Sequence, residues 1–210
     1  MIKKNLKILI ITSVAILLPL VAGIILWERL PEQIPSHWDI NGNVDGWTSK
    51  DMSVFGFPAL MLLLHWVSIF VTTSDPKRQN HSQKLLGLVF WLIPAISIFL
   101  SALTYSVAMD NEVHVEKIVP VILGVLFVFI GNYMPKCKQN YTVGIKLPWT
   151  LNSEENWNKT HRLAGWIWVA GGLIIAFSGF FNLLPIVIAV SVMMVAVPIV
   201  YSYVLHRKNV

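Results

Sequence analysis

Three side chains near the end of a polar stretch are of the types that carry out nucleophilic chemistry. Ser153, Thr160 and His161 could in principle supply a nucleophile and its base. Neither a G-x-S-x-G turn nor an H-E-x-x-H ligand pair accompanies them. Because no set of nucleophile, base and orienting group is recognisable, the sequence favours a structural or binding role for these residues over catalysis.

A second polar stretch begins like a calcium-binding loop. Asp39, Asn41 and Asn43 occupy the first, third and fifth positions of such a loop. The pattern then fails, because the glycine of the sixth position is Val44 and the glutamate of the twelfth is Lys50. Asp and Asn also form turns, and a turn explains the same residues.

A metal site built from scattered residues is the remaining route to an enzyme. His37, Asp39, Asp45 and His114 could be its ligands, but their spacing gives no sign that they meet. The single cysteine, Cys137, can form neither an internal disulfide nor a cysteine-based metal site, and we expect a free structural thiol. We therefore predict no metal, no cofactor and no enzymatic activity.

The elements that must position these stretches are very apolar. Of 210 residues, 55% are hydrophobic and only 13% are charged, which excludes an ordinary soluble domain. Most of the apolar runs are close to the ~20 residues that cross a bilayer. The sequence thus predicts an all-α integral membrane protein with six transmembrane helices, the first retained and the fourth the shortest. The predicted spans are 6–27, 52–71, 85–107, 118–133, 163–181 and 185–203.

The distribution of charge predicts the orientation of these spans. Thirteen of the sixteen Lys and Arg residues lie at the termini or in the second and fourth connections, and eight of the eleven acidic residues lie in the other connections. Because basic residues in short loops stay in the cytoplasm, we expect both termini and the 134–162 loop inside, and the 28–51 loop outside. The net charge of +5 then reflects topology, and no basic patch with interleaved aromatics indicates direct nucleic-acid binding.

The interiors of the spans carry no Lys, Arg, Asp or Glu. Ion-coupled carriers usually place such groups there, so this composition argues against one. For His65, the one titratable side chain near a midplane, we expect a neutral imidazole hydrogen-bonded to a neighbouring helix rather than a proton relay. Gly172 and Ala176 have the small-x-x-x-small spacing that predicts a close helix contact.

The two polar loops are both expected to be ordered. The 28–51 loop is rich in turn formers, and we expect a compact flap on the outer surface, with Trp38 and Trp47 at the lipid headgroups. In the 134–162 loop, residues 140–148 suit an extended or hairpin-like return. Asn152, with Glu155 three residues later, predicts a capped interfacial helix over 153–162.

Tryptophans and one histidine flank or occupy that expected helix. Trp157 and His161 share a face, being four residues apart. Together with Trp149, Trp166 and Trp168, they are expected to hold the loop flat against the inner leaflet.

Both loops match longer patterns. N-Y-x-x-G-I-K-x-P-W-T-L-x-S-x-x-x-W-x-x-T-H-R-x-x-G, residues 140–165, resembles the signature of the SdpI family of bacterial membrane proteins. L-P-x-x-I-P-x-H-W-x-x-x-G-x-x-D-G-W-x-S-K, residues 30–50, is similar to a module of unknown function commonly fused in front of it. The resemblance implies an N-terminal two-helix module, residues 1–84 with the 28–51 loop, and a four-helix module, residues 85–210 with the 134–162 loop.

The resemblance also implies a function in the cytoplasmic membrane of a bacterium. The best-known members of this family are immunity proteins that protect a bacterium from a secreted, membrane-active peptide toxin made during cannibalism or delayed sporulation. The founding system also acts as a receptor, which holds a small transcriptional repressor of the ArsR type at the membrane when toxin is present. The implied partners are therefore a toxin peptide outside, a repressor inside and the lipid bilayer.

Candidate residues for these partners follow from the predicted location of the loops alone. The toxin-side candidates are His37, Trp38, Asp45, Gly46, Trp47 and Lys50. The partner-side candidates are Asn140, Gly144, Ile145, Lys146, Pro148, Trp149, Thr150, Ser153, Trp157, Thr160, His161 and Arg162.

Two other interpretations of the loops and spans stay open. The 134–162 loop could be a purely structural cuff that orders the fourth and fifth spans. The whole protein could be an exporter or channel for a toxin or small amphiphile, which would need a polar track through the spans.

Overall fold

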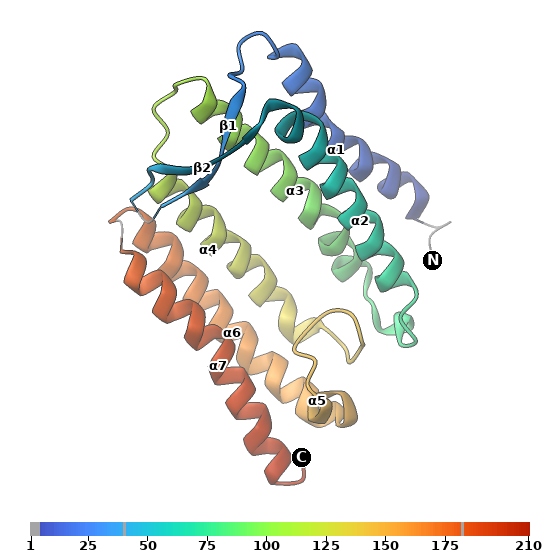
Figure 1. Ribbon diagram of the computed structural model, residues 1–210. Helices are drawn as coiled ribbons and strands as arrows, with labels where there is room; N and C mark the ends of the chain where they lie inside the picture. Colours follow the sequence, from blue (N-terminus) through green and yellow to red (C-terminus); the bar gives the residue numbers. More distant parts are fainter. Residues whose placement is uncertain (1–4, 40, 182) are drawn as a thin grey trace. The chain divides into compact units, whose positions relative to one another are not determined.

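A computed structural model describes residues 5–39, 41–181 and 183–210. Within these ranges, six helices are long and apolar enough to cross a membrane, which confirms the predicted number. Their helical elements are α1 (Leu6–Ile25), α2 (Phe57–Thr73), α3 (Gln83–Ala108), α4 (Val115–Tyr133), α6 (Glu154–Gly179) and α7 (Leu184–Arg207), drawn in Figure 1. Shorter elements are the strands β1 (Gln33–Trp38) and β2 (Val44–Ser49), the π-helix η2 (Met52–Gly56), the 3-10 helices η3 (Arg78–Asn80) and η4 (Met134–Lys136), and α5 (Pro148–Asn152).

The chain divides into two compact units. The first unit consists of residues 1–73 and 86–115, and the second of residues 74–85 and 116–210. Most of α3 therefore packs with α1 and α2. The predicted boundary between residues 1–84 and 85–210 separates two sequence modules. The packing of the helices does not test it, and it stays a prediction.

The helices of the first unit pack around two apolar clusters. Leu9 of α1 and Ile69 of α2 meet Leu86 and Phe90 of α3 in one of them. Between α1 and α2, the Oγ1 of Thr12 lies 3.0 Å from Nε2 of His65, whose side chain is fully buried. The predicted hydrogen bond from His65 to a neighbouring helix is confirmed.

The 28–51 loop folds as a β-hairpin, which the sequence did not predict. Its strands β1 and β2 are antiparallel, and the register is interrupted on both sides of His37. At the tip, Asp39 accepts hydrogen bonds from the backbone N–H groups of Asn41 and Asn43, both at 2.8 Å, and Gly42 has a φ of 84°. Hydrogen bonds from Asn43, first from its side chain, lower the pKa of Asp39. A turn thus accounts for the residues that resemble a calcium loop.

In the second unit, α4 and α6 approach until their backbones touch. A Cβ built on Gly172 would lie 2.6 Å from the carbonyl oxygen of Gly124, and a Cβ on Gly124 would collide with the backbone nitrogen of Ala176 at 2.5 Å. The close contact predicted from Gly172 and Ala176 is therefore confirmed. Gly124, the partner of both, was not singled out from the sequence.

The predicted interfacial helix over 153–162 is wrong as a separate element. These residues form the first turns of α6, a single helix of 26 residues that continues through the fifth span. Its N-cap is Ser153, whose Oγ accepts a hydrogen bond from the N–H of Asn156 at 3.1 Å, and not Asn152. Trp157 is fully buried within the second unit, so it cannot lie among lipid headgroups as predicted, whereas Trp166 is 73% exposed.

The predicted orientation leads to a labelling result. Gln33→Cys and Asn158→Cys place thiols at exposed positions of the hairpin and of α6. Cys137 adds little background, because it is only 6% exposed and burial raises the pKa of its thiol to about 11. In intact cells, a membrane-impermeant maleimide is expected to label position 33 at once, and position 158 only after permeabilisation. The reverse labelling pattern would mean that the orientation in the membrane is the opposite of the predicted one.

Candidate functional site

The hairpin of the first unit carries four residues predicted for the toxin side. Nδ1 of His37 lies 2.5 Å from the carboxylate of Asp45, and both side chains face solvent. Gly46 pairs with His37 across the ladder, and a Cβ there would be 2.9 Å from the Cβ of His37. Trp47 follows with 56% of its surface exposed. The hairpin thus presents a histidine-carboxylate pair beside an exposed indole.

Lys50 turns inward and fastens the base of the hairpin. Its ammonium forms an ion pair with Glu32 at 2.9 Å, donates to the carbonyl of Trp27 at 3.3 Å and lies 4.9 Å from the centre of the Trp27 ring. Because the side chain is only 9% exposed, a partner cannot reach its charge in this structure. The contacts give Lys50 a structural role at the junction of α1 and the hairpin.

The metal-site candidates do not assemble into a ligand set. Within residues 5–39, 41–181 and 183–210, no group of three or more His, Cys, Asp or Glu side chains is placed to hold a metal ion. His37 and Asp45 meet each other, while Asp39 is engaged in its turn.

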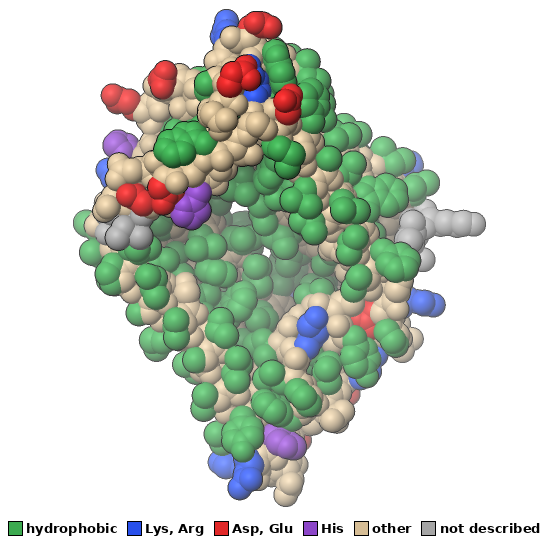
Figure 2. All heavy atoms as spheres, viewed as in Figure 1, with side chains coloured by type: hydrophobic (Ala, Val, Ile, Leu, Met, Phe, Trp, Pro, Cys, Tyr) green, Lys and Arg blue, Asp and Glu red, His purple; other side chains and the backbone are tan. Residues whose placement is uncertain are grey.

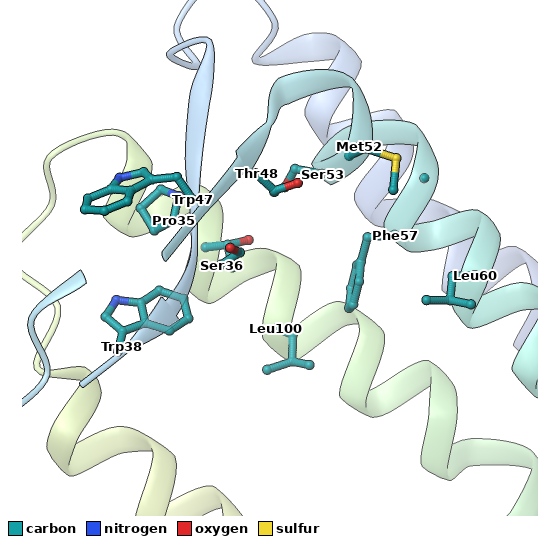
Figure 3. A pocket seen from close by; sticks show the side chains of 12 residues that line it. Pro35, Ser36, Trp38, Trp47, Thr48, Met52, Ser53, Phe57, Leu60 and Leu100 are labelled. Carbon is teal, nitrogen blue, oxygen red and sulfur yellow. The ribbon is translucent and has the colours of Figure 1, made fainter. Parts of the chain in front are cut away.

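A cavity of about 570 Å³ lies beneath the hairpin, within the first unit (Figure 3). Its walls come from both strands, from η2 and the start of α2, and from α3. Trp38 and Trp47, predicted to lie at lipid headgroups, line it. The other lining residues are Pro35, Ser36, Thr48, Met52, Ser53, Gly56, Phe57, Leu60, Leu100 and Thr104. Sequence patterns did not reveal the cavity, since it depends on how the hairpin packs on two helices.

The 134–162 loop of the second unit is held together by its own polar side chains. Asn140 is fully buried, and its Oδ1 accepts hydrogen bonds from the N–H groups of Thr142 and Val143, at 2.9 and 2.7 Å. Its Nδ2 donates to the carbonyl oxygens of Lys138 and Val143, at 2.8 and 3.0 Å. These hydrogen bonds of Asn140 therefore stabilise the turn over residues 138–143.

The next part of the loop packs flat onto two stacked rings of α6. Trp157 and His161 have ring centroids 4.0 Å apart. Gly144 lies against both, with a φ of 124°, and a Cβ there would collide with Nε2 of His161 and approach the Trp157 ring to 3.0 Å. The indole N–H of Trp157 donates to the carbonyl of Cys137 at 2.7 Å. Only glycine fits at position 144, both for its backbone conformation and for its space.

The tautomer of His161 follows from its two partners. Nε2 accepts a hydrogen bond from the N–H of Ile145 at 2.9 Å, so this nitrogen carries no proton. Nδ1 lies 2.8 Å from the carbonyl oxygen of Trp157, so it is the nitrogen that donates. The imidazole is therefore neutral, with both nitrogens committed to the backbone.

The residues that could have formed a catalytic set have other partners. Ser153 caps α6, Thr160 donates to Oδ1 of Asn156 at 3.1 Å, and neither nitrogen of His161 is available to a nucleophile. Thr150 is likewise structural: its hydroxyl accepts from the N–H of Leu147 at 2.9 Å.

The sequence did not reveal that the carboxylate of Asp75 links residues 74–85 to this loop. Asp75 is buried, and its carboxylate accepts hydrogen bonds from the N–H groups of Lys77 and Tyr141 and from the hydroxyl of Thr142, at 2.7, 2.9 and 3.0 Å. Nε2 of the buried His81 lies 3.4 Å from the same carboxylate. Asp-Pro at 75–76 was a visible turn signal, but partners some 66 residues away leave no mark on a single sequence.

The ionisation of Asp75 makes this tie sensitive to acid. Burial alone raises its pKa, but the hydrogen bonds from Lys77, Tyr141 and Thr142 and the attraction to His81 outweigh it and lower the pKa below the ordinary 3.8. The carboxylate therefore stabilises the fold fully above pH 3.8 and loses this contribution as the pH falls through its folded pKa.

Asp75→Asn is accordingly expected to be less stable than the wild type at pH 6, and the difference in Tm should narrow only below pH 3.8. Thermal unfolding of both proteins in detergent over a pH series checks this. A difference that already vanishes near pH 5 would mean that the pKa of Asp75 is raised rather than lowered.

Few of the partner-side candidates present a surface. Lys146, Pro148 and Arg162 are exposed. Trp149 is half-buried, because its indole N–H donates to Ser202 at 2.9 Å and its ring stacks on His206. Among the other candidates, Asn140, Thr150, Trp157, Thr160 and His161 are buried, so a partner cannot reach these five side chains in this structure.

Comparison with known proteins gives a consistent result. The SdpI/YfhL protein family matches residues 136–202, and a domain of unknown function, DUF1648, matches residues 14–62. The chain is 29% identical over 209 residues to Immunity protein SdpI of Bacillus subtilis (strain 168), covering 98% of this chain and 97% of the relative. No solved structure matches the chain. The two family regions contain the hairpin and most of the 134–162 loop.

Proposed function

Since the chain belongs to the SdpI family and is a multi-pass protein of the cell membrane, we propose that it is an immunity protein. It protects the cell that makes it from a secreted, membrane-active peptide toxin. The observation that carries this proposal is the similarity to an immunity protein over nearly the full length of both chains. A shared fragment would support only a shared fold, whereas this similarity includes both ordered loops and all six spans.

The contacts in the 134–162 loop support binding rather than catalysis. Much of the signature is explained by the fold: Asn140 forms a turn, Gly144 packs on two rings, and His161 is a neutral hydrogen-bonding group. What the signature builds is a rigid surface rather than a set of reacting groups. In this proposal, immunity depends on binding at the outer surface rather than on a reaction carried out by this loop.

A receptor role is the finer part of the proposal. The side chains of Lys146, Pro148 and Arg162 are exposed in the loop or at the start of α6, and the predicted topology places them in the cytoplasm. They are the surface on which a repressor of the ArsR type would be held. Two exposed cations there suit a partner with an acidic patch.

The test of immunity uses a sensitive bacterium that makes no immunity protein. Cells expressing the chain, or an empty vector, are challenged with a membrane-active peptide toxin purified from Bacillus subtilis cultures, and survival and membrane potential are followed. The chain is expected to keep both near unchallenged levels. Equal killing with and without the chain would refute immunity, and toxin transport by the protein in liposomes would replace it with the exporter interpretation.

Receptor and immunity functions are separable by charge reversal on the loop. Arg162→Glu removes an exposed cation without touching the buried contacts of its neighbour His161. We expect toxin protection to persist while recruitment of a fluorescently tagged repressor to the membrane is lost. Asn158→Glu, at an exposed neutral position of the same helix, is the matched control. Loss of protection along with recruitment would show that the two functions are not separate.

A further inference from the structure

We propose that the cavity beneath the hairpin is the docking site for the apolar side chains of a cationic, membrane-active peptide. This inference rests on the proposed immunity function and adds where, and to which kind of peptide, the protein binds. The cavity belongs wholly to the first unit (Figure 3).

The size and lining of the cavity suit apolar side chains. About 570 Å³ lies within the range of pockets that enclose a drug-sized ligand. Phe57, Leu60 and Leu100 form its helical wall, while Pro35 and Trp47 form part of its hairpin wall. Such a lining gains free energy by removing an aromatic or aliphatic group from water.

The depth of the cavity suits an amphiphile lying at the membrane surface. One end is the hairpin, whose strands also contribute Ser36 and Thr48. The other end is Leu60, about two turns below the start of the π-helix at Met52. A bound segment would therefore keep polar groups near the hairpin and place apolar ones at the level of the acyl chains.

Charge decides which amphiphile is favoured. In the face shown in Figure 2, acidic side chains gather over the hairpin end of the first unit. Asp45 and Asp51 are exposed beside the lining residues Trp47 and Met52. Lys50, a cation of the hairpin, is turned inward and paired with Glu32. Apart from the imidazole of His37, which pairs with Asp45, the exposed charged side chains close in sequence to these lining residues are acidic, and they attract a cationic peptide more strongly than a zwitterionic lipid.

The wall formed by η2 can adapt to different side chains. A π-helix is a local widening of the helix that often occurs at functional sites, and here three of its residues, Met52, Ser53 and Gly56, line the cavity. A Cβ on Gly56 would lie 2.7 Å from the sulfur of Met52, so the thioether occupies the space that glycine leaves. Methionine is flexible and polarizable, which lets this wall move aside for a ligand.

Filling the cavity is the first test. Ser36→Trp projects an indole from a lining position of β1, and Gln33→Trp places the same residue at an exposed position of the same strand that does not line the cavity. Expressed at equal membrane levels under toxin challenge, Ser36→Trp is expected to lower survival by about tenfold or more, because the indole would take the space of the bound side chains, while Gln33→Trp protects like the wild type. Retained protection by Ser36→Trp would overturn the inference.

Photocrosslinking is the second test, and it needs no loss of function. The photoreactive residue p-benzoylphenylalanine replaces Leu60, which lines the cavity, or Leu63, which lies on α2 outside it and is similarly exposed (51% and 61%). With the purified Bacillus subtilis toxin peptide in membranes, position 60 is expected to crosslink the peptide several-fold more than position 63, and less so at high salt. Equal yields at both positions, or crosslinks to phospholipid alone, would overturn the inference.

The two proposals fail in different ways. A wild type that gives no protection overturns the immunity function and this inference together. Full protection by the wild type and by Ser36→Trp, with no preferred crosslink at position 60, overturns the cavity site alone and leaves immunity standing.

Discussion

Gly144→Ala is expected to lower the apparent Tm of the purified protein by roughly 10 °C, the shift that a loss of about 3 kcal/mol produces in a chain of this size. Two costs add up. A φ of 124° is strained for any residue with a Cβ, at about 1–3 kcal/mol, and the new methyl group collides with His161 and Trp157. Neither ring can move aside, because the imidazole holds Ile145 and the indole holds Cys137.

Cys137 offers a built-in readout for this result. The thiol is the only one in the chain and packs with Leu85 and Trp157, so a thiol-reactive fluorophore reports when this part of the second unit opens. Gly87→Ala is the matched control, since a Cβ at Gly87 has no neighbour within 4 Å. If both alanine variants reacted at the same temperature as the wild type, the packing of Gly144 on the rings would be wrong.

Gly124→Leu is expected to have an effect of similar size, about 3 kcal/mol, by driving α4 and α6 apart. The contact at Gly124 is with backbone atoms of Gly172 and Ala176, which cannot change rotamer to make room. The helices can only separate, and separation breaks the dispersion contacts along the whole interface.

Thermal unfolding followed by circular dichroism, together with the yield of monodisperse protein in detergent, measures this loss. Val125→Leu is the control, because Val125 is the next residue along α4 and is exposed. Should Gly124→Leu match the control in both yield and Tm, α4 and α6 would not be in backbone contact.

How much of the fold could be predicted depends on the range of the interaction involved. The six spans follow from local composition, and the contact at Gly172 and Ala176 follows from a four-residue spacing. His65 was predicted correctly because an imidazole in an apolar helix has few other solutions. Each of these inferences uses only residues within one helix.

The failures involve partners distant in sequence or competing roles for one residue type. Tryptophan next to a span favours the lipid interface, yet Trp157 finds Leu85 and Cys137 and is buried. The hairpin was read as turns because Asn, Asp and Gly dominate its tip, while its strands, QIPSHW and VDGWTS, do not alternate regularly between apolar and polar residues. Asp75 depends on Tyr141 and Thr142, and the cavity depends on packing between elements.

The candidate sites were predicted as loops rather than as surfaces. Both segments are ordered in the structure, as expected, but the sequence could not separate residues that build a loop from residues that a partner can touch. Lys50 was predicted to contact a partner, but its side chain is buried and pairs with Glu32. Lys146 and Arg162, in contrast, are exposed. Burial makes that distinction, and burial is a property of the fold.

Because α6 is one continuous helix, the directions in which its side chains point are fixed relative to one another. At about 1.5 Å per residue its 26 residues extend about 39 Å, more than the ~30 Å of a hydrocarbon core, so its first turns stand out from the membrane as a post. Each residue added to or removed from the helix would turn that post by about 100°. Trp157 and His161 would then face away from Gly144. The packing of the loop therefore depends on the number of residues in the transmembrane part of this helix.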